Sequence, residues 1–343
     1  MTESLTLDFQ KVNASSTISG RIRTAAEDFQ VDEIQQFTPS GIGEHVWLHI
    51  KKTGENTDWV AAELAKIAGV PRRDVSYAGM KDRNAVTTQW FSVQMPGKEA
   101  PDWKADLPVS IQILEEKRHD KKLRRGALLG NQFKLIIRDF SGDQSELDET
   151  ISRITEQGVP NYFGAQRFGN YCFNVIRAEK WFKGEFKLKD RAKRSIYLSA
   201  ARSWIFNHIL SARVTDGTWN KAIEGDVFML KDSNSFFLGM VNDEIIKRVN
   251  NQEINPSGAL WGRGRLPTQG AIAGLEQDIA SQFAVLCEGL EKNGLKQERR
   301  SLRLNVNDLS CEKLEDGILS LNFSLPTGTY ATTVLEEIGT FTS

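Results

Sequence analysis

The sequence predicts a mixed α/β protein, because strand-like and helix-like periodicities both recur along it. Apolar and polar residues alternate in residues 45–50, 133–138 and 319–325, as in strands that bury one face of a sheet. Apolar residues recur every three or four positions in residues 57–68, 198–212 and 279–290, as in amphipathic helices. The fold class we expect is therefore α/β (α+β mixed).

The length of the chain and the position of its strands predict two domains. Its 343 residues exceed what one compact core usually holds. The strands at the two ends of the chain can pair by hydrogen bonds if the final strand, which includes the segment 330–338, joins the N-terminal sheet. We therefore expect residues 1–156 and 299–343 to form one discontinuous domain. Residues 157–298 are then a helical insertion, with few strands between its two amphipathic helices.

The composition excludes several classes of protein. A hydrophobic content of 40% and a charged content of 26% are typical of a soluble globular chain. Three widely separated cysteines and four scattered histidines predict no disulfide framework, no zinc site and a reducing cytoplasm. The polar N-terminus resembles no signal peptide, and no stretch approaches a membrane span. Phosphate-loop, dinucleotide-binding, metalloprotease and serine-hydrolase motifs are missing, so we expect no metal or organic cofactor.

Residues 76–93 carry the first candidate site, because they predict a strand, a tight loop and a second strand. The loop contains Lys81, Asp82 and Arg83, and a helix precedes it that Thr57 can cap. A carboxylate on a rigid loop can act as a nucleophile or a general base, and a neighbouring cation would keep it ionised. The alternative is a solvated turn without a function.

Other stretches allow a functional and a structural interpretation. Residues 117–125 and 183–194 each contain six basic residues, which form either phosphate-binding faces or solvated helix faces. The aromatic residues of 160–170 are either core or platforms for bases. Asn131 follows a glycine and is either a turn residue or an amide that contacts a base edge.

The motifs resemble those of the TruD family of tRNA pseudouridine synthases. Residues 79–89, GMKDRNAVTTQ, match the family signature G-x-K-D-x-x-A-x-T-x-Q. Four further blocks agree in the family's order and span most of the chain. They are Glu27-Asp28-Phe29-x-Val31-x-Glu33, Gly130-Asn131-x-Phe133 with Arg138, Pro160-Asn161-Tyr162-Phe163-Gly164-x-Gln166-Arg167-Phe168-Gly169, and Ser199-Ala-Ala-Arg202-Ser203-x-x-Phe206-Asn207.

The resemblance implies a fold and an activity. The fold would be a pseudouridine synthase domain with a mainly antiparallel sheet, and a TRUD domain inserted in it would form a cleft with it. The activity would be isomerisation of uridine to pseudouridine, typically at position 13 in the D-arm of tRNA, after the base is flipped out. The partner would be tRNA, for a cytoplasmic monomer that needs no protein partner.

The resemblance also implies roles for single residues. The family's catalytic aspartate falls on Asp82, whose attack could fall on C6 of the base or on C1′ of the ribose. Phe29 would pack on the target base, and Asn131 would make a polar contact near it. Lys81 would be the electrostatic neighbour of Asp82, while the basic runs and Arg167 would position phosphates.

Two positions depart from the family pattern. Tyr330 stands where a phenylalanine is usual, so its ring should preserve stacking while its hydroxyl can add a hydrogen bond. Arg23 stands where a lysine is common, which keeps the charge but not the geometry.

Two other functions fit part of the sequence. A non-catalytic RNA-binding module would use the same aromatic and basic residues, but it would have no need of the Lys-Asp loop. A glycosidase usually requires a second acid at a partner position, and no such pair is marked.

Overall fold

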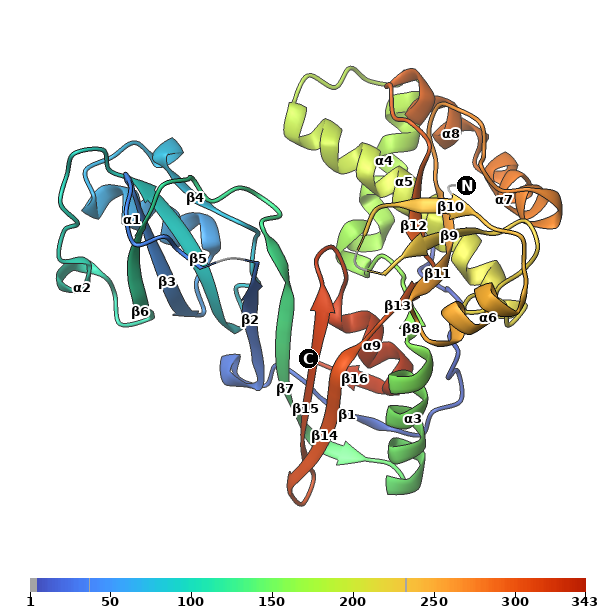
Figure 1. The fold of residues 1–343 in the computed structure, drawn as a ribbon, viewed down its shortest axis with the longest axis horizontal. Helices are drawn as coiled ribbons and strands as arrows, with labels where there is room; N and C mark the ends of the chain where they lie inside the picture. Colours follow the sequence, from blue (N-terminus) through green and yellow to red (C-terminus); the bar gives the residue numbers. More distant parts are fainter. Residues whose placement is uncertain (1–4, 37, 232) are drawn as a thin grey trace. The chain divides into compact units, whose positions relative to one another are not determined.

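The computed structural model describes residues 5–36, 38–231 and 233–343, which group into two compact units (Figure 1). The sheet unit comprises Thr17–Ile151, Asn307–Gly328 and Thr340–Ser343. The helical unit comprises Ser152–Val306, Thr329–Gly339 and the described part of Met1–Ser16. Each unit thus combines segments that lie far apart in the sequence. The assignment of residues 157–298 as an inserted domain stays a prediction.

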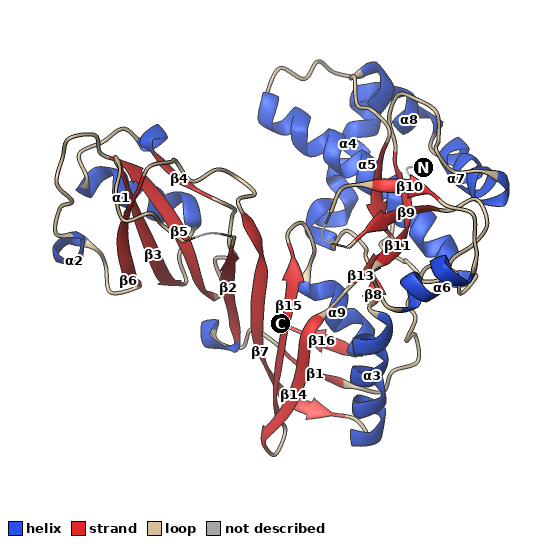
Figure 2. Cartoon of the chain, viewed as in Figure 1, coloured by secondary structure: helices blue, strands red, loops and turns tan. Residues whose placement is uncertain are grey.

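A mainly antiparallel sheet of ten described strands forms the sheet unit (Figure 2). Its strands are β1 (Ser19–Arg21), β2 (Phe29–Gln35), β3 (His45–Thr53), β4 (Val75–Tyr77), β5 (Val86–Gln94), β6 (Ile111–His119), β7 (Leu128–Ser141), β14 (Asn307–Glu315), β15 (Ile318–Pro326) and β16 (Thr340–Thr342). The main order is β14-β15-β7-β2-β5-β3-β6, with β1, β4 and β16 paired at its sides. Strand β2 pairs in parallel with β5, and β1 pairs in parallel with β16. The predicted fold class is confirmed.

The C-terminal part of the chain joins the N-terminal sheet, as the strand pattern predicts. Strand β15 pairs along its length with β7, in a register that sets Leu325 opposite Asn131. The expectation of a strand after residue 330 is wrong, because Ala331–Ile338 form the helix α9. Val334, Leu335 and Ile338 lie at helical spacing and are buried, so this segment gains a core contact as a helix.

Helix α1 (Thr57–Ile67) packs its apolar face on the sheet and leads towards the candidate loop. Val60 and Leu64 are buried against Leu48 and Ile50 of β3. Thr57 is not the cap that the sequence predicts. Asn56 takes that position with an extended backbone, and its side chain accepts a hydrogen bond from the Asp58 amide at 2.8 Å. The buried Thr57 hydroxyl is left free to bind the loop. Helices α2 (Trp103–Asp106) and α3 (Gln144–Gln157) follow later in the chain.

The helical unit is organised around the long helix α5 (Arg191–Thr215). Trp204, Ile205 and Ile209 of this helix lie in the largest apolar cluster of the unit. The second predicted helix is divided at Phe283, whose backbone leaves the helical region with ψ of 36°. The other helices of this unit are α4 (Phe173–Phe182), α6 (Asp243–Asn250), α7 (Gly270–Gln282), α8 (Ala284–Lys292) and α9.

The region between these helices contributes three strands to a sheet that β12 completes, which corrects the expectation that it has few strands. Strands β10 (Phe236–Leu238), β9 (Val227–Leu230), β11 (Ile254–Leu260) and β12 (Glu298–Ser301) form a four-stranded sheet in this order. Strand β11 was not recognisable because its sequence, INPSGAL, contains Pro256 and Gly258 and is buried on both faces, so polar and apolar residues do not alternate. Strands β8 (Val159–Pro160) and β13 (Arg303–Leu304) pair separately.

Two further expectations concern the environment of the protein. Every helix in the described parts of the chain is too short or too polar to cross a lipid bilayer. The three cysteines are free; Cys172 and Cys287 are buried, and Cys311 is partly buried.

Candidate active site

Asp82 lies on the loop between β4 and β5, so the predicted strand–loop–strand arrangement is confirmed. Its Oδ2 accepts an ion-pair contact from the Arg23 Nη2 at 2.9 Å, while its Oδ1 accepts a hydrogen bond from the Asn84 amide at 3.1 Å. The side chains of Asp82 and Arg23 keep 28% and 23% of their surface exposed. The carboxylate is thus oriented by two partners and still reachable by a ligand.

Buried polar side chains anchor the backbone of this loop from below. The Thr57 hydroxyl accepts a hydrogen bond from the Lys81 amide at 3.0 Å and donates one to Gln89 Oε1 at 3.0 Å. The Gln89 side chain donates to the Gly79 carbonyl at 3.2 Å. Thr57 and Gln89 have no exposed surface, so water does not compete with these bonds. The loop is a fixed mount rather than a solvated turn.

Lys81 belongs to this mount. Its ammonium group lies 2.5 Å from Glu33 Oε1, and the two side chains are only 6% and 2% exposed. Glu33 also accepts a hydrogen bond from the Trp90 amide at 3.0 Å, which ties β2 to β5. Lys81 therefore pairs with Glu33, whereas Arg23 pairs with the carboxylate of Asp82.

Arg23 connects Asp82 with the predicted base-stacking residue Phe29. The guanidinium carbon of Arg23 lies 4.2 Å from the centre of the Phe29 ring. Phe29 is 3% exposed and meets Phe133 edge to face at 6.3 Å. Arg23 has a backbone φ of 59°, a left-handed conformation that is uncommon for a residue with a side chain. The Arg23 guanidinium therefore covers one face of the Phe29 ring.

An ion pair fixes the turn between Arg23 and Phe29. Asp28 is 1% exposed and accepts hydrogen bonds from Arg138 Nε and Nη2 at 2.9 and 2.8 Å. It also accepts one from the Ala25 amide at 2.9 Å. The hydrogen bond from Arg138 lowers the pKa of Asp28, against the opposing effect of burial. The Asp28–Arg138 ion pair is therefore formed at neutral pH, and it holds the turn with Arg23 and Phe29 in place.

Asn131 lies inside β7 and not in a turn, so the turn interpretation is wrong. It stands directly opposite Glu33 of β2, and its side chain therefore shares a face of the sheet with Glu33 and Phe29. Its Oδ1 is buried and has no hydrogen-bond partner among the described residues. A buried amide oxygen without a partner is an acceptor that a bound ligand can satisfy.

The remaining predicted site residues, Arg167 and Tyr330, lie together in the helical unit. The Tyr330 hydroxyl accepts hydrogen bonds from Arg167 Nε and Nη2 at 3.1 and 2.8 Å. Arg167 Nη1 donates to the Ser199 hydroxyl at 2.6 Å. The Tyr330 ring meets Phe163 edge to face at 6.5 Å. The tyrosine hydroxyl thus makes the additional hydrogen bonds that a phenylalanine could not.

The aromatic residues of 160–170 serve mainly as core. Tyr162 and Phe168 are 7% and 0% exposed and belong to apolar clusters of the helical unit. Phe163 is half-buried and lies 4.0 Å below the guanidinium carbon of Arg300. The platform interpretation is therefore wrong for Tyr162 and Phe168.

The two basic runs are largely exposed. In residues 117–125, Arg124 and Arg125 are exposed, and the Lys122 ammonium donates to the Arg73 carbonyl at 2.8 Å. Gly126, which follows this run, donates from its amide to the Ala78 carbonyl at 2.8 Å. The first basic run thus ends beside the strand that leads into the Asp82 loop. The second run, 183–194, connects α4 to the start of α5.

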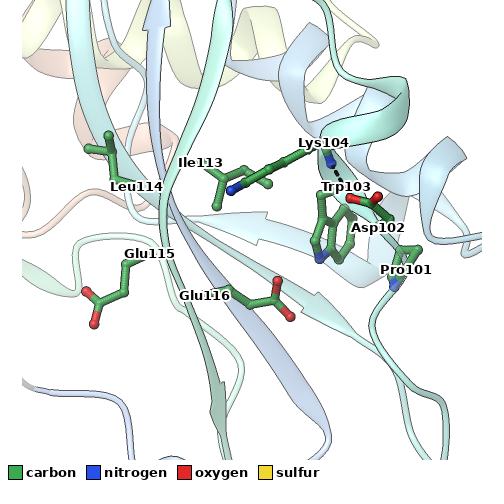
Figure 3. Close-up of a pocket in the computed structure, with 8 residues that line it drawn as sticks. All are labelled: Pro101, Asp102, Trp103, Lys104, Ile113, Leu114, Glu115 and Glu116. Carbon is green, nitrogen blue, oxygen red and sulfur yellow. Dashed lines mark hydrogen bonds between the residues drawn. The ribbon is translucent and has the colours of Figure 1, made fainter.

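A pocket of about 330 Å³ lies in the sheet unit beside α2 and β6 (Figure 3). Its lining contains none of the predicted site residues, so we do not assign it to the reaction. The pocket is lined by Pro101, Asp102, Trp103, Lys104, Ile113, Leu114, Glu115 and Glu116. Within the described residues, no three histidine, cysteine, aspartate or glutamate side chains are grouped so that they could hold a metal ion.

Four residues of the site were not assigned a role from the sequence. Gln89 and Glu33 stand in the motifs, but nothing in their spacing reveals the Gly79 carbonyl or Lys81 as partners. Thr57 was noted only as a cap. For Lys52 the sequence does indicate a buried position, because this residue continues the buried alternation of Leu48 and Ile50 in β3.

Comparison with known proteins gives consistent matches. The family model "tRNA pseudouridine synthase D (TruD)" matches residues 10–187 and 171–338. The tRNA pseudouridine synthase D of Methylococcus capsulatus is 50% identical, over 97% of this chain and 95% of that protein. That of Hydrogenovibrio crunogenus is 45% identical, over 92% of both chains. A crystal structure titled as tRNA pseudouridine synthase D (TruD) from Methanosarcina mazei has the same fold, with a TM-score of 0.73 at 22% identity over 96% of this chain and 95% of that one.

The mainly antiparallel sheet and these matches define an enzyme of the pseudouridine synthase class, an isomerase. The chain belongs to the tRNA pseudouridine synthase D (TruD) family.

Proposed function

We propose that this protein isomerises uridine to pseudouridine in tRNA, at position 13 of the D-arm, with Asp82 as the nucleophile. The observation that carries this proposal is the carboxylate of Asp82, held on an anchored loop by Arg23 and Asn84. Membership of the TruD family supports the reaction and the substrate class. The position within the tRNA rests on the motif resemblance.

The reaction needs few chemical groups. The bond between N1 of the uracil and C1′ of the ribose breaks, the base turns, and C5 bonds to C1′. The hydrogen leaves C5 and N1 gains one, so no atoms are added or lost. Asp82 attacks either C6 of the base or C1′ of the ribose, and a carboxylate can do both without a cofactor. The Arg23 guanidinium, 2.9 Å away, orients the carboxylate through a charge-assisted contact.

The surroundings of Asp82 can hold an extruded uracil. Arg23 covers Phe29 in the structure, so a base can stack on the guanidinium plane or replace it on the ring. The unpaired Oδ1 of Asn131 can accept a hydrogen bond from an N–H of the uracil. These features support our proposal that Phe29, Arg23 and Asn131 bind the base.

The exposed basic runs are assigned to the tRNA backbone. Arg124 and Arg125 lie next to the strand that leads to Asp82, so phosphates bound there would adjoin the reacting nucleotide. All three guanidinium nitrogens of Arg167 already donate to Tyr330 or Ser199. We assign Arg167 first to orienting Tyr330 and only then to a phosphate. We expect the enzyme to work as a cytoplasmic monomer.

The decisive experiment compares the wild type with Asp82→Asn on unmodified tRNA, with pseudouridine mapped chemically. We expect conversion at position 13 by the wild type and at least a thousandfold loss in the variant. Binding of tRNA should stay within about threefold, because an amide keeps the shape of the loop and affinity comes mainly from phosphate contacts. Asp316→Asn is the matched control, since Asp316 is fully exposed and its ion-pair partner among the described residues is Lys313.

The possible outcomes separate the competing functions. Wild-type protein that binds tRNA without converting it would identify a non-catalytic RNA-binding module. Activity in Asp82→Asn equal to that of the control would disprove the nucleophile assignment. Conversion at another uridine would correct the position alone.

A further inference from the structure

Lys52 is a buried lysine that touches the backbone of Asp82 itself. It lies in β3 and has 0% of its surface exposed. Its ammonium donates hydrogen bonds to the Asp82 carbonyl at 2.9 Å and to the Glu55 carbonyl at 2.8 Å. The side chain points to the same face of β3 as the apolar residues Leu48 and Ile50, because side chains alternate along a strand. At the next position of this buried face, where an apolar side chain is expected, the strand therefore carries an ammonium group that contacts the loop.

A charged group at this position is costly, which argues that it has a role. Burial lowers the pKa of Lys52 to about 8, although the negative charge of Asp82 raises it. The group still carries its third proton at neutral pH and can serve both carbonyls. A methionine would fill similar space without the cost of desolvation, but it would leave two partly buried carbonyl groups without these donors. The need to fill space in the core therefore does not explain why residue 52 is a lysine.

The other anchors of the loop do not replace this contact. Thr57 and Gln89 bind the loop at Lys81 and Gly79, before the aspartate. The side chain of Asp82 is bound by Arg23 and Asn84. Lys52 binds its carbonyl, so the backbone and both carboxylate oxygens of the same residue are each held by a different partner. Without Lys52, the peptide after Asp82 can rotate, and this rotation would redirect the carboxylate.

We propose that Lys52 is a positioning residue of the reaction, which fixes the Asp82 carbonyl so that the carboxylate points at the reacting nucleotide. This inference rests on the proposed function of Asp82. Lys52 does not touch the substrate, and its removal should slow the chemical step without changing the affinity for tRNA. A displacement on the order of 1 Å in a catalytic group can cost about a hundredfold in rate.

The test uses Lys52→Met, with Lys51→Met as the matched control. Lys51 is the preceding residue of β3, and it is exposed on the opposite face of the strand. Single-turnover rates with saturating enzyme and the Kd for unmodified tRNA are measured for both variants. We expect the rate of Lys52→Met to fall about 10- to 100-fold while its Kd stays within about twofold. Lys51→Met should keep the wild-type rate. A wild-type rate in folded Lys52→Met would overturn the proposal.

Hydrogen exchange provides a second measurement that does not depend on activity. In Lys52→Met, amide exchange should accelerate at least tenfold in residues 78–86 and remain unchanged in α1. Equal acceleration in both segments would show a loss of stability without a positioning role, and it would overturn the inference. If Lys52→Met does not fold, Lys52→Gln replaces it, because its amide keeps N–H donors on a shorter side chain. The expected losses are then at least threefold, and a wild-type rate again contradicts the proposal.

The two proposals fail in different ways. If the wild type itself does not convert tRNA, the proposed function is wrong, whatever the exchange data show. If the wild type is active, Asp82→Asn is inactive and Lys52→Met is fully active, only the inference about Lys52 is wrong.

Discussion

At the scale of single residues, arginine at position 23 makes contacts that lysine could not combine. Its guanidinium contacts Asp82 through one nitrogen, and its central carbon lies over the Phe29 ring, 4.2 Å from the ring centre. An ammonium group is compact and strongly hydrated, so it can pair with a carboxylate but does not stack as a plane. A lysine at position 23 would therefore keep the charge next to Asp82 but would cover the ring of Phe29 differently.

At Tyr330, the contributions of the hydroxyl group and of the ring can be tested separately. In Tyr330→Phe the ring remains, but Arg167 loses the acceptor of two hydrogen bonds. We expect the free energy of unfolding of the helical unit to fall by about 1–2 kcal/mol, as for hydrogen bonds to a charged donor. Urea denaturation measures this change.

The control for Tyr330→Phe is Tyr330→Ala, which removes the ring as well. If Tyr330 stacks on the substrate, conversion of tRNA should drop at least tenfold more in the alanine variant than in the phenylalanine variant. Equal rates in the two variants would assign the function of Tyr330 to its hydroxyl and not to its ring.

At the scale of elements, the first turn of α1 has two separable tasks. Asn56 caps the helix, whereas Thr57 binds the loop through Lys81 and Gln89. Adjacent residues thus divide helix stability and loop position between them. The sequence did not distinguish these tasks, because both residue types can cap a helix.

Substitutions at these two positions should therefore have different effects. Thr57→Val keeps the shape of the side chain but leaves the Lys81 amide and the side-chain oxygen Oε1 of Gln89 without this partner, at a cost of about 1–3 kcal/mol. Asn56→Ala removes only the cap, which costs about 1 kcal/mol. We expect Thr57→Val to accelerate hydrogen exchange in residues 78–86 and to lower the rate of conversion. Asn56→Ala should affect α1 alone, and the reverse pattern would contradict this division.

At the scale of the whole molecule, His208 makes stability depend on pH. It packs among Phe9, Trp204 and Phe283, with ring centres 5.3, 5.0 and 4.7 Å away. Burial lowers its pKa from 6.5 to about 4. The unfolded chain therefore binds a proton between pH 6.5 and 4 that the folded chain does not, and stability is lost as the pH falls through this window.

The substitution His208→Phe should remove this loss. The Nε2 atom of His208 is buried without a hydrogen-bond partner in the described parts of the chain, so a phenyl ring loses no bond there. We expect the wild type to lose up to about 3 kcal/mol more than His208→Phe between pH 7 and 4, since one pKa unit corresponds to about 1.4 kcal/mol. Urea denaturation at several pH values measures the difference. Parallel curves for the two proteins would show that another group is responsible.

Whether an element could be predicted from the sequence depends on whether its apolar residues recur with a regular period. Alternation identified β3, β7 and β15, because apolar residues stand at every second position over part of each strand. It failed for β11, where both faces are buried and periodicity vanishes. It also failed after Tyr330, where apolar residues occur at a spacing that fits a strand as well as a short helix.

The candidate site was predictable where its residues lie in one motif. The loop of Asp82 and its two strands followed from residues 76–93 alone. The contact from Arg23 to Asp82 joins residues almost sixty positions apart, and only the fold brings them together. Lys52 was in principle recognisable from its place in the buried alternation of β3, but the carbonyl that it binds was not.

The pairing of β15 with β7 also determines when the sheet unit can be completed during synthesis. The strands up to β7 leave the ribosome long before residues 318–326. Until then β7, which pairs with β2 on one side, presents an open edge on its other side. Open strand edges invite pairing with other chains. A nascent chain stalled before residue 318 would contain Asp82, Arg23 and Phe29 but lack this cover. We therefore expect translation to pass through an interval in which the catalytic loop is already made and the sheet that carries it is most prone to misassociate.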